Sequence, residues 1–189
     1  RREIGVLVGH KAHVSSVTFS PDGCSLATSC ADCSIKLWDI ASRQELATFY
    51  GHSQWANAAI FFPDGKTLAS CSDDGTIKFW DAGAKKQDPI LGGATNAVDS
   101  MDISPDGKLV ATGQRDGIVS LWEVASQKIR GTWRAAVGTS VHCCVFSPNG
   151  QALLTASDDR KVILWDLASQ KEMRNLGGHE GVVQNAVFS

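Results

Sequence analysis

The sequence predicts an all-β fold built from repeated four-stranded antiparallel sheets. Two landmarks recur together along the 189 residues. A tryptophan followed by an acid recurs at spacings of 42, 42 and 43 residues, at Trp38, Trp80, Trp122 and Trp165. A Pro-Asp-Gly or Pro-Asn-Gly turn keeps the same spacings, at 21–23, 63–65, 105–107 and 148–150. Two independent landmarks in register four times establish an internal repeat of stacked units.

Within one period every segment is typical of a strand or a turn. A first strand ending at Phe19 leads into the first Pro-Asp-Gly turn, where Pro presets φ and Gly accepts a positive φ, so the chain reverses. Further strands are expected at 26–28, at 35–38 and, after a polar loop, at 45–50. Four short strands per repeat make one β-propeller blade, whereas a helical solenoid would show apolar spacings near 3.6 residues.

The repeat predicts one domain, a partial β-propeller over residues 1–189. Four complete blades are expected, at about 13–50, 55–92, 97–134 and 140–177. Residues 3–8 are predicted as the outer strand of a preceding blade, and 182–189 as the inner strand of a following one. A propeller closes by pairing strands from its two ends, so we expect a longer chain or a second copy to supply the remaining blades.

Composition and charge exclude several classes of partner. Hydrophobic residues make up 43% and charged residues 20% of the chain, and the net charge is −2. No basic face is available for a phosphate backbone, so a nucleic-acid partner is not expected. No apolar run reaches the roughly 18 residues of a membrane span, so no membrane partner is expected either. Six scattered cysteines and the lack of a signal peptide predict free thiols in a reducing, intracellular compartment, cytoplasmic or nuclear.

Several landmarks of the second period resemble the WD-repeat family. They are a Gly-His pair at 51–52, the turn at 62–65, a Leu-Ala-Ser strand at 68–70, an Asp-Gly turn at 74–75 and the Trp-Asp pair at 80–81. The resemblance covers nearly the whole chain and is highly specific for fold. It implies a propeller, commonly of seven blades, that presents its loops to protein partners. It is weak for function, because one fold serves many unrelated complexes.

The resemblance also implies a hydrogen-bonded tetrad of His, Ser or Thr, Asp and Trp in each blade. A buried Trp N–H needs an acceptor and a buried Asp needs donors, which gives the tetrad its physical reason. By position the members are His10, Thr28, Asp32 and Trp38; His52, Ser70, Asp74 and Trp80; Thr112, Asp116 and Trp122; and Thr155, Asp159 and Trp165. The third blade has Ala94 in place of the His, and the fourth has an inserted residue near Val137.

A Ser, His and Asp set invites a second interpretation, a hydrolase. A catalytic triad needs an exposed nucleophile and an oxyanion hole, usually once per domain. Here the set recurs blade after blade beside a Trp, which is typical of a structural network. We therefore predict no catalytic residues.

Cys30 and Cys33 form a Cys-x-x-Cys pair at a strand turn. Zinc usually takes four ligands, and the chain has no second such pair, so metal and redox roles are minor alternatives. The sequence favours small residues of strands and turns, with no metal and no cofactor.

The resemblance implies that partners bind the face made by the loops before the inner strand and after the second strand. The positions that commonly point there are His13, Ser15 and Ala31; Trp55, Asn57 and Asp73; Ala97, Asp99 and Arg115; and Ser140, His142 and Asp158. Trp55 stands outside the repeating Trp column, where a large aromatic suits a contact residue, although packing on a neighbouring loop is an alternative. Three acids against a lone Arg115 predict a mildly negative face, and thus a partner with a Lys or Arg anchor.

The sequence therefore predicts a non-catalytic scaffold for protein or peptide partners, a module of a larger chain or a multi-subunit assembly. A nucleic-acid or lipid-headgroup reader on the same fold is the first alternative, and the balanced charge argues against it. An enzyme is the second, and it would need a polar cluster that does not repeat.

Overall fold

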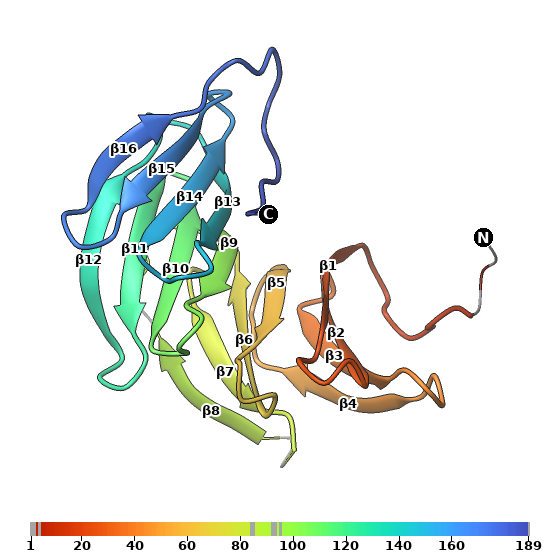
Figure 1. The fold of residues 1–189 in the computed structure, drawn as a ribbon. Coiled ribbons are helices and arrows are strands. Elements are labelled where there is room, and N and C mark those ends of the chain that lie inside the picture. Colours follow the sequence, from red (N-terminus) through yellow and green to blue (C-terminus); the bar gives the residue numbers. More distant parts are fainter. Residues whose placement is uncertain (1–2, 4, 84–85, 92–93, 95, 189) are drawn as a thin grey trace. The chain divides into compact units, whose positions relative to one another are not determined.

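The computed structural model describes residues 3, 5–83, 86–91, 94 and 96–188. The chain divides into two compact units, residues 1–90 and 91–189, and each unit contains two consecutive four-stranded sheets (Figure 1). The described strand pairings are antiparallel and follow chain order, so the predicted all-β class with four-stranded blades is confirmed. The described residues contain no helix that is long and apolar enough to cross a membrane.

The first unit holds blades one and two. Blade one comprises β1 (Val14–Phe19), β2 (Ser25–Cys30), β3 (Ser34–Asp39) and β4 (Glu45–Tyr50). Blade two comprises β5 (Ala56–Phe61), β6 (Thr67–Ser72), β7 (Ile77–Asp81) and β8 (Lys86–Leu91). The order within each sheet is sequential, from the inner to the outer strand.

The second unit repeats this plan in blades three and four. Blade three comprises β9 (Val98–Ile103), β10 (Leu109–Gln114), β11 (Ile118–Glu123) and β12 (Lys128–Arg134). Blade four comprises β13 (Val141–Phe146), β14 (Ala152–Ser157), β15 (Val162–Asp166) and β16 (Lys171–Asn175).

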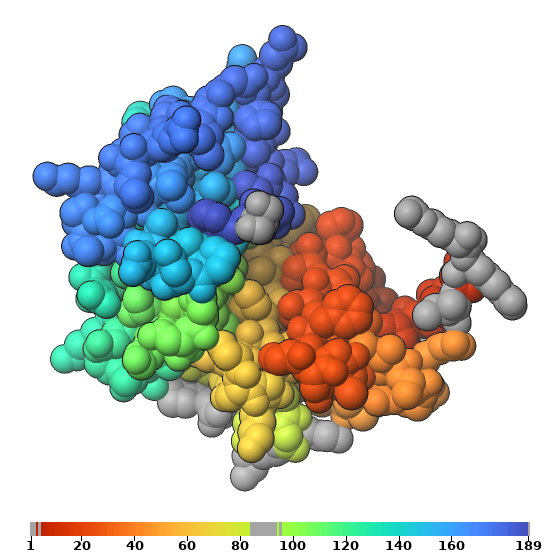
Figure 2. All heavy atoms as spheres, in the orientation of Figure 1, coloured from red at the N-terminus to blue at the C-terminus, as the bar shows by residue number. Residues whose placement is uncertain are grey.

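The two flanking segments differ from the prediction. Neither 3–8 nor 182–189 is a strand over its described residues; residues 4 and 189 lie outside them. A strand is defined by a hydrogen-bonded neighbour, and none of the described strands pairs with either segment. The second segment nevertheless packs on blade four, where Val183, Ala186 and Phe188 join an apolar cluster with Leu154 and Val162 (Figure 2).

Consecutive blades within a unit are joined by an apolar layer. In the first unit, Ile35 and Leu37 of β3 pack with Ala59 and Phe61 of β5. Phe49 of β4 stacks on the tetrad tryptophan of blade two, with 5.4 Å between ring centroids. The second unit has the same arrangement: the ring centroid of Trp133 on β12 lies 5.9 Å from that of Trp165 on β15. The apolar positions of the inner strands β5 and β13 are thus buried by the preceding blade of the same unit.

The loop that leads into blade four packs on a glycine of blade three. Both Ala135 and Ala136 donate their N–H groups to the carbonyl of Gly117, at 2.9 and 3.1 Å. Gly117 has φ +83°, and a Cβ there would lie 2.1 Å from the carbonyl oxygen of Ala136. Only glycine fits this contact, and the two alanines are buried in the apolar layer between the blades.

A carboxylate also links the inner strands of blades three and four. The backbone N–H of Phe146 on β13 donates to Oδ2 of Asp102 on β9, at 2.7 Å. Burial raises the pKa of Asp102, and hydrogen bonds from the Phe146 and Ile103 backbones only partly oppose this. The ionised carboxylate is therefore disfavoured in the folded state relative to the unfolded chain.

Asp102→Asn should gain stability relative to the wild type as the pH rises. The pKa of Asp102 is raised in the folded state. Its contribution to the free energy of unfolding is therefore full below the unfolded pKa of 3.8 and is lost as the pH rises through the folded pKa. The asparagine oxygen still accepts from Phe146 without carrying a charge. Denaturant titrations of both proteins at pH 4 and pH 7 check this. The prediction would be contradicted if the unfolding free energy of the variant, relative to that of the wild type, were lower at pH 7 than at pH 4.

Candidate functional site

Blade two contains a continuous hydrogen-bond chain through its four predicted tetrad residues. The indole N–H of Trp80 donates to Oγ of Ser70 at 2.8 Å, and this hydroxyl lies 2.7 Å from Nε2 of His52. Nδ1 of His52 lies 3.0 Å from Oδ2 of Asp74. Because a carboxylate only accepts, Nδ1 carries the proton and Nε2 accepts from the serine hydroxyl. The polar side-chain groups of Trp80, Ser70, His52 and Asp74 thereby all have hydrogen-bond partners.

The protonation states agree with this chain. Burial lowers the pKa of His52, more than the neighbouring Asp74 carboxylate raises it, so the imidazole is neutral at pH 7. Burial pushes the pKa of Asp74 upward, but hydrogen bonds from Thr76 and the Ser53 backbone lower it to about 2. An ionised Asp and a neutral His are the forms that the tetrad requires.

Blade one forms the same chain with slightly looser geometry. Trp38 donates to Thr28 at 2.8 Å, Thr28 lies 2.7 Å from Nε2 of His10, and Nδ1 lies 3.3 Å from Asp32. The backbone N–H of Lys11 also donates to Asp32, at 2.9 Å. The structure therefore brings together all four predicted members in both blades of the first unit.

Blades three and four keep the Trp–Thr hydrogen bond of the tetrad but lack the histidine. Trp122 donates to Thr112 at 3.1 Å, and Trp165 donates to Thr155 at 2.8 Å. The two aspartates are held locally instead. Asp116 accepts from the Ile118 N–H at 3.2 Å.

In blade four, Asp159 accepts from the hydroxyl of Ser157 at 2.5 Å and from the Lys161 N–H at 3.2 Å. Blade three places a buried Gln114 beside its tetrad, and its amide donates to the Ser120 hydroxyl at 2.8 Å. Neither blade has the histidine that joins the hydroxyl to the aspartate in blades one and two.

The Ser70–His52–Asp74 distances match those of a catalytic triad, yet the environment does not. Ser70 is completely buried, and its oxygen already accepts the Trp80 N–H. Substrate could not reach the hydroxyl without unfolding the blade. The arrangement stabilises the blade and offers no nucleophile.

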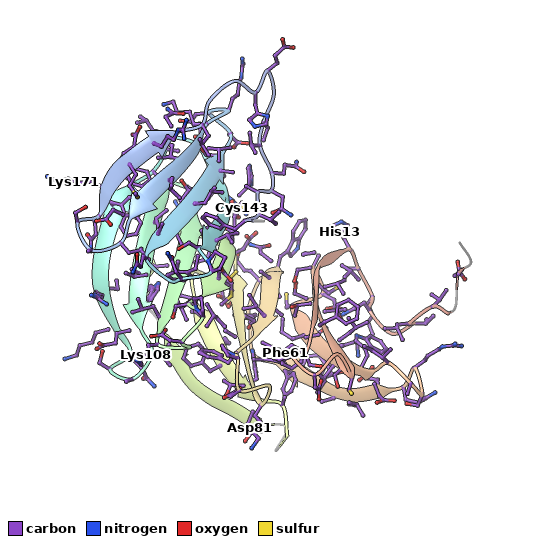
Figure 3. The ribbon with its side chains drawn as sticks, viewed as in Figure 1. His13, Phe61, Asp81, Lys108, Cys143 and Lys171 are labelled. Carbon is purple, nitrogen blue, oxygen red and sulfur yellow. The ribbon has the colours of Figure 1, made fainter. Side chains whose placement is uncertain are left out.

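The predicted partner-face positions lie at one end of each sheet. In every blade the carbonyl before the inner strand accepts the N–H of the residue that precedes the tetrad aspartate. These bonds join Ala31 to His13, Asp73 to Trp55, Arg115 to Ala97 and Asp158 to Ser140, at 2.9–3.2 Å. Figure 3 labels His13, the residue before β1, and Lys108, which follows the Pro-Asp-Gly turn between β9 and β10. The loops named in the prediction therefore adjoin one another within each blade.

A feature that sequence reasoning missed is a bulge in every inner strand. The pairing of inner and second strands shifts register around one residue in each blade, namely Ser15, Asn57, Asp99 and His142. A bulge inserts an extra residue and re-aims its side chain. The bulged residue occupies the same position in each repeat, but its residue type differs from blade to blade, so the sequence did not mark it.

In three blades the bulged residue contacts the residue sixteen positions later. Asn57 donates its amide to Asp73 at 2.7 Å. Arg115 donates to Asp99 at 2.7 Å, and Nε2 of His142 lies 2.7 Å from Asp158.

These pairs alter the expected charge of the face. The lone Arg115 is paired with Asp99 at 2.7 Å, which offsets part of the negative charge expected from the three acids. The acid of blade two, Asp73, is bonded by an uncharged amide.

Trp55 lies in the loop before β5, as predicted, and 58% of it is exposed. The four repeating tryptophans are at most 7% exposed. Three other predicted face residues, Ala97, Ser140 and Ala31, are buried or partly buried and offer little contact area.

Comparison with known proteins identifies the family. The family model described as "WD domain, G-beta repeat" matches residues 1–39, 43–81, 86–123 and 127–166. The chain belongs to the WD-repeat family. A search of curated proteins finds no match. Each matched WD repeat ends at the third strand of a sheet, so a repeat and a blade are offset by one strand.

Ser70→Ala should destabilise the protein by about 1–3 kcal/mol, because it leaves both the Trp80 N–H and the acceptor of His52 unpaired in the interior. Thr112→Val is the matched control: it removes the hydroxyl at nearly constant shape and leaves one unpaired donor, Trp122. We expect the control to cost less in denaturant titrations. Equal losses would show that the histidine arm of the WD tetrad adds nothing to stability.

Proposed function

We propose that this WD-repeat chain is a non-catalytic platform that binds protein or peptide partners at the loop end of its blades. WD-repeat domains generally serve as interaction scaffolds, and the tetrads of this chain are structural networks rather than reactive groups. The platform would act as a module of a larger chain or multi-subunit assembly in a reducing intracellular compartment. Its six free cysteines agree with that location.

The observation that carries the proposal is the exposed indole of Trp55 at the loop end of blade two. An aromatic ring of this size gains from being covered, and Trp is enriched among residues that dominate binding energy. The backbone N–H of Asp73 donates to the carbonyl of Trp55 at 3.0 Å, so an acidic residue lies next to Trp55 on the neighbouring loop.

The pairing of an indole with a carboxylate favours a cationic anchor on the partner. A Lys or Arg side chain can lie over the indole ring and reach the carboxylate of Asp73, and such cation–π contacts contribute about 0.5–2 kcal/mol. The Asn57 amide donates to this carboxylate at 2.7 Å and holds it in place. Blade three lacks this combination, because its acid is paired with Arg115.

Trp55→Ala and Asp73→Ala should each weaken partner capture at least tenfold while leaving the fold intact. Affinity purification with quantitative mass spectrometry would compare the proteins retained by the wild type and by each variant. Lys108→Ala is the matched control, since this lysine is 79% exposed and follows the Pro-Asp-Gly turn, away from the loop end. Circular dichroism checks folding. Partners lost with Lys108→Ala but kept with Trp55→Ala would place binding elsewhere.

A further inference from the structure

Blade one differs from its neighbours by a thiol beside the tetrad. The residue two positions before the tetrad aspartate is Cys30 in blade one, and Ser72, Gln114 and Ser157 in the others. The structure brings ligand atoms of His10, Cys30 and Asp32 within 4.8 Å of one another. The tetrad prediction already joined His10 to Asp32, but the orientation of the Cys30 thiol toward them comes only from the structure.

We propose that Cys30, His10 and Asp32 form a zinc-binding site with one coordination position left for water. Sulfur, imidazole nitrogen and carboxylate oxygen are the three ligand types that zinc takes in proteins. Nδ1 of His10 and Oδ2 of Asp32 are 3.3 Å apart. Two ligands each about 2.0–2.1 Å from a tetrahedral zinc ion are separated by about that distance.

The surroundings of the sulfur suit a metal-bound thiolate. The backbone N–H of Asp32 points at Sγ of Cys30, at 3.4 Å, and the Ala12 backbone also hydrogen-bonds the thiol. Such outer contacts support metal-bound ligands. Cys30 is fully buried, whereas His10 and Asp32 are partly buried, so the site would lie at the end of the blade with limited access to solvent.

The hydrogen bonds of the tetrad can be rearranged when zinc binds, with bonds to zinc replacing the hydrogen bond between His10 Nδ1 and Asp32. In the empty tetrad Nδ1–H donates to Asp32, and the Thr28 hydroxyl donates to Nε2 at 2.7 Å. Zinc on Nδ1 requires the other tautomer, in which Nε2–H donates to Thr28. The Thr28 proton then turns to the carbonyl of Lys36, 3.5 Å away.

The remaining groups tolerate this change as well. The Trp38 N–H keeps Thr28 as its acceptor. Asp32 keeps its hydrogen bond from the Lys11 N–H, because each carboxylate oxygen has two lone pairs. The reaction takes up zinc and releases the Cys30 proton to solvent.

Blade two provides an internal control. Its Asp74 N–H points at the hydroxyl of Ser72 at 3.1 Å, as Asp32 does at Cys30, and His52 and Asp74 occupy the same positions. Serine is a poor zinc ligand, so blade two should not bind. Ser72→Cys should create a second site there.

Titration with Co²⁺, followed by its thiolate charge-transfer band and by competition with Zn²⁺, tests the proposal. We expect one equivalent for the wild type, none for Cys30→Ser and two for Ser72→Cys. Cys30→Ser should weaken Zn²⁺ binding by more than the ~10–100-fold that loss of an outer contact costs. It should fold, because serine already stands at this position in blades two and four.

Cys33→Ser is the second control and should leave both stoichiometry and affinity unchanged. Loss of binding in this variant would assign the metal to the Cys-x-x-Cys pair and overturn the proposal. No stoichiometric binding by the wild type, or unchanged binding by Cys30→Ser, would overturn it too. A folded Ser72→Cys variant that gains no second equivalent would also count against it.

Discussion

The fold depends on one hydrogen bond that recurs in every blade, from a buried tryptophan N–H to a Ser or Thr hydroxyl on the second strand. It is present in all four sheets, at 2.8–3.1 Å. The indole supplies much of the apolar layer between blades, and its one polar atom must be satisfied there. The Ser or Thr hydroxyl accepts this hydrogen bond. In blades one and two the same hydroxyl also bonds to the histidine, which links it to the aspartate.

The two units solve the same packing problem with different residues. In the first unit the histidine carries the chain from hydroxyl to aspartate, which ties the loop before each inner strand to the turn after the second strand. In the second unit Gly117 of blade three and the buried Ala135–Ala136 pair hold the loop that enters blade four. The partner-face loops of the first unit are therefore held by His–Asp hydrogen bonds, and those of the second by backbone contacts together with the Asp99–Arg115 and His142–Asp158 pairs.

Much of the fold could be predicted because each landmark has a local physical cause. The predicted fourth strand at 45–50 coincides with β4, since a polar loop and a Trp-Asp pair mark where it begins. The flanking segments were predicted less well. In the segment predicted as an inner strand, Val183 is buried and Phe188 partly buried, but the sequence cannot supply the hydrogen-bonded neighbour that a strand needs. The Asp99–Arg115 pair was missed because it depends on the bulge, which changes register by one residue.

The most direct test of this account is hydrogen exchange at the six indole N–H groups, resolved by NMR. We expect Trp38, Trp80, Trp122 and Trp165 to exchange only through opening of their blades, and thus far more slowly than the exposed Trp55. Trp133, whose N–H is buried without a hydrogen-bond partner among the described residues, should fall between them. If any of the four tetrad indoles exchanges as fast as Trp55, the hydrogen bond from the tryptophan to the Ser or Thr hydroxyl does not stabilise that blade, which would contradict the account.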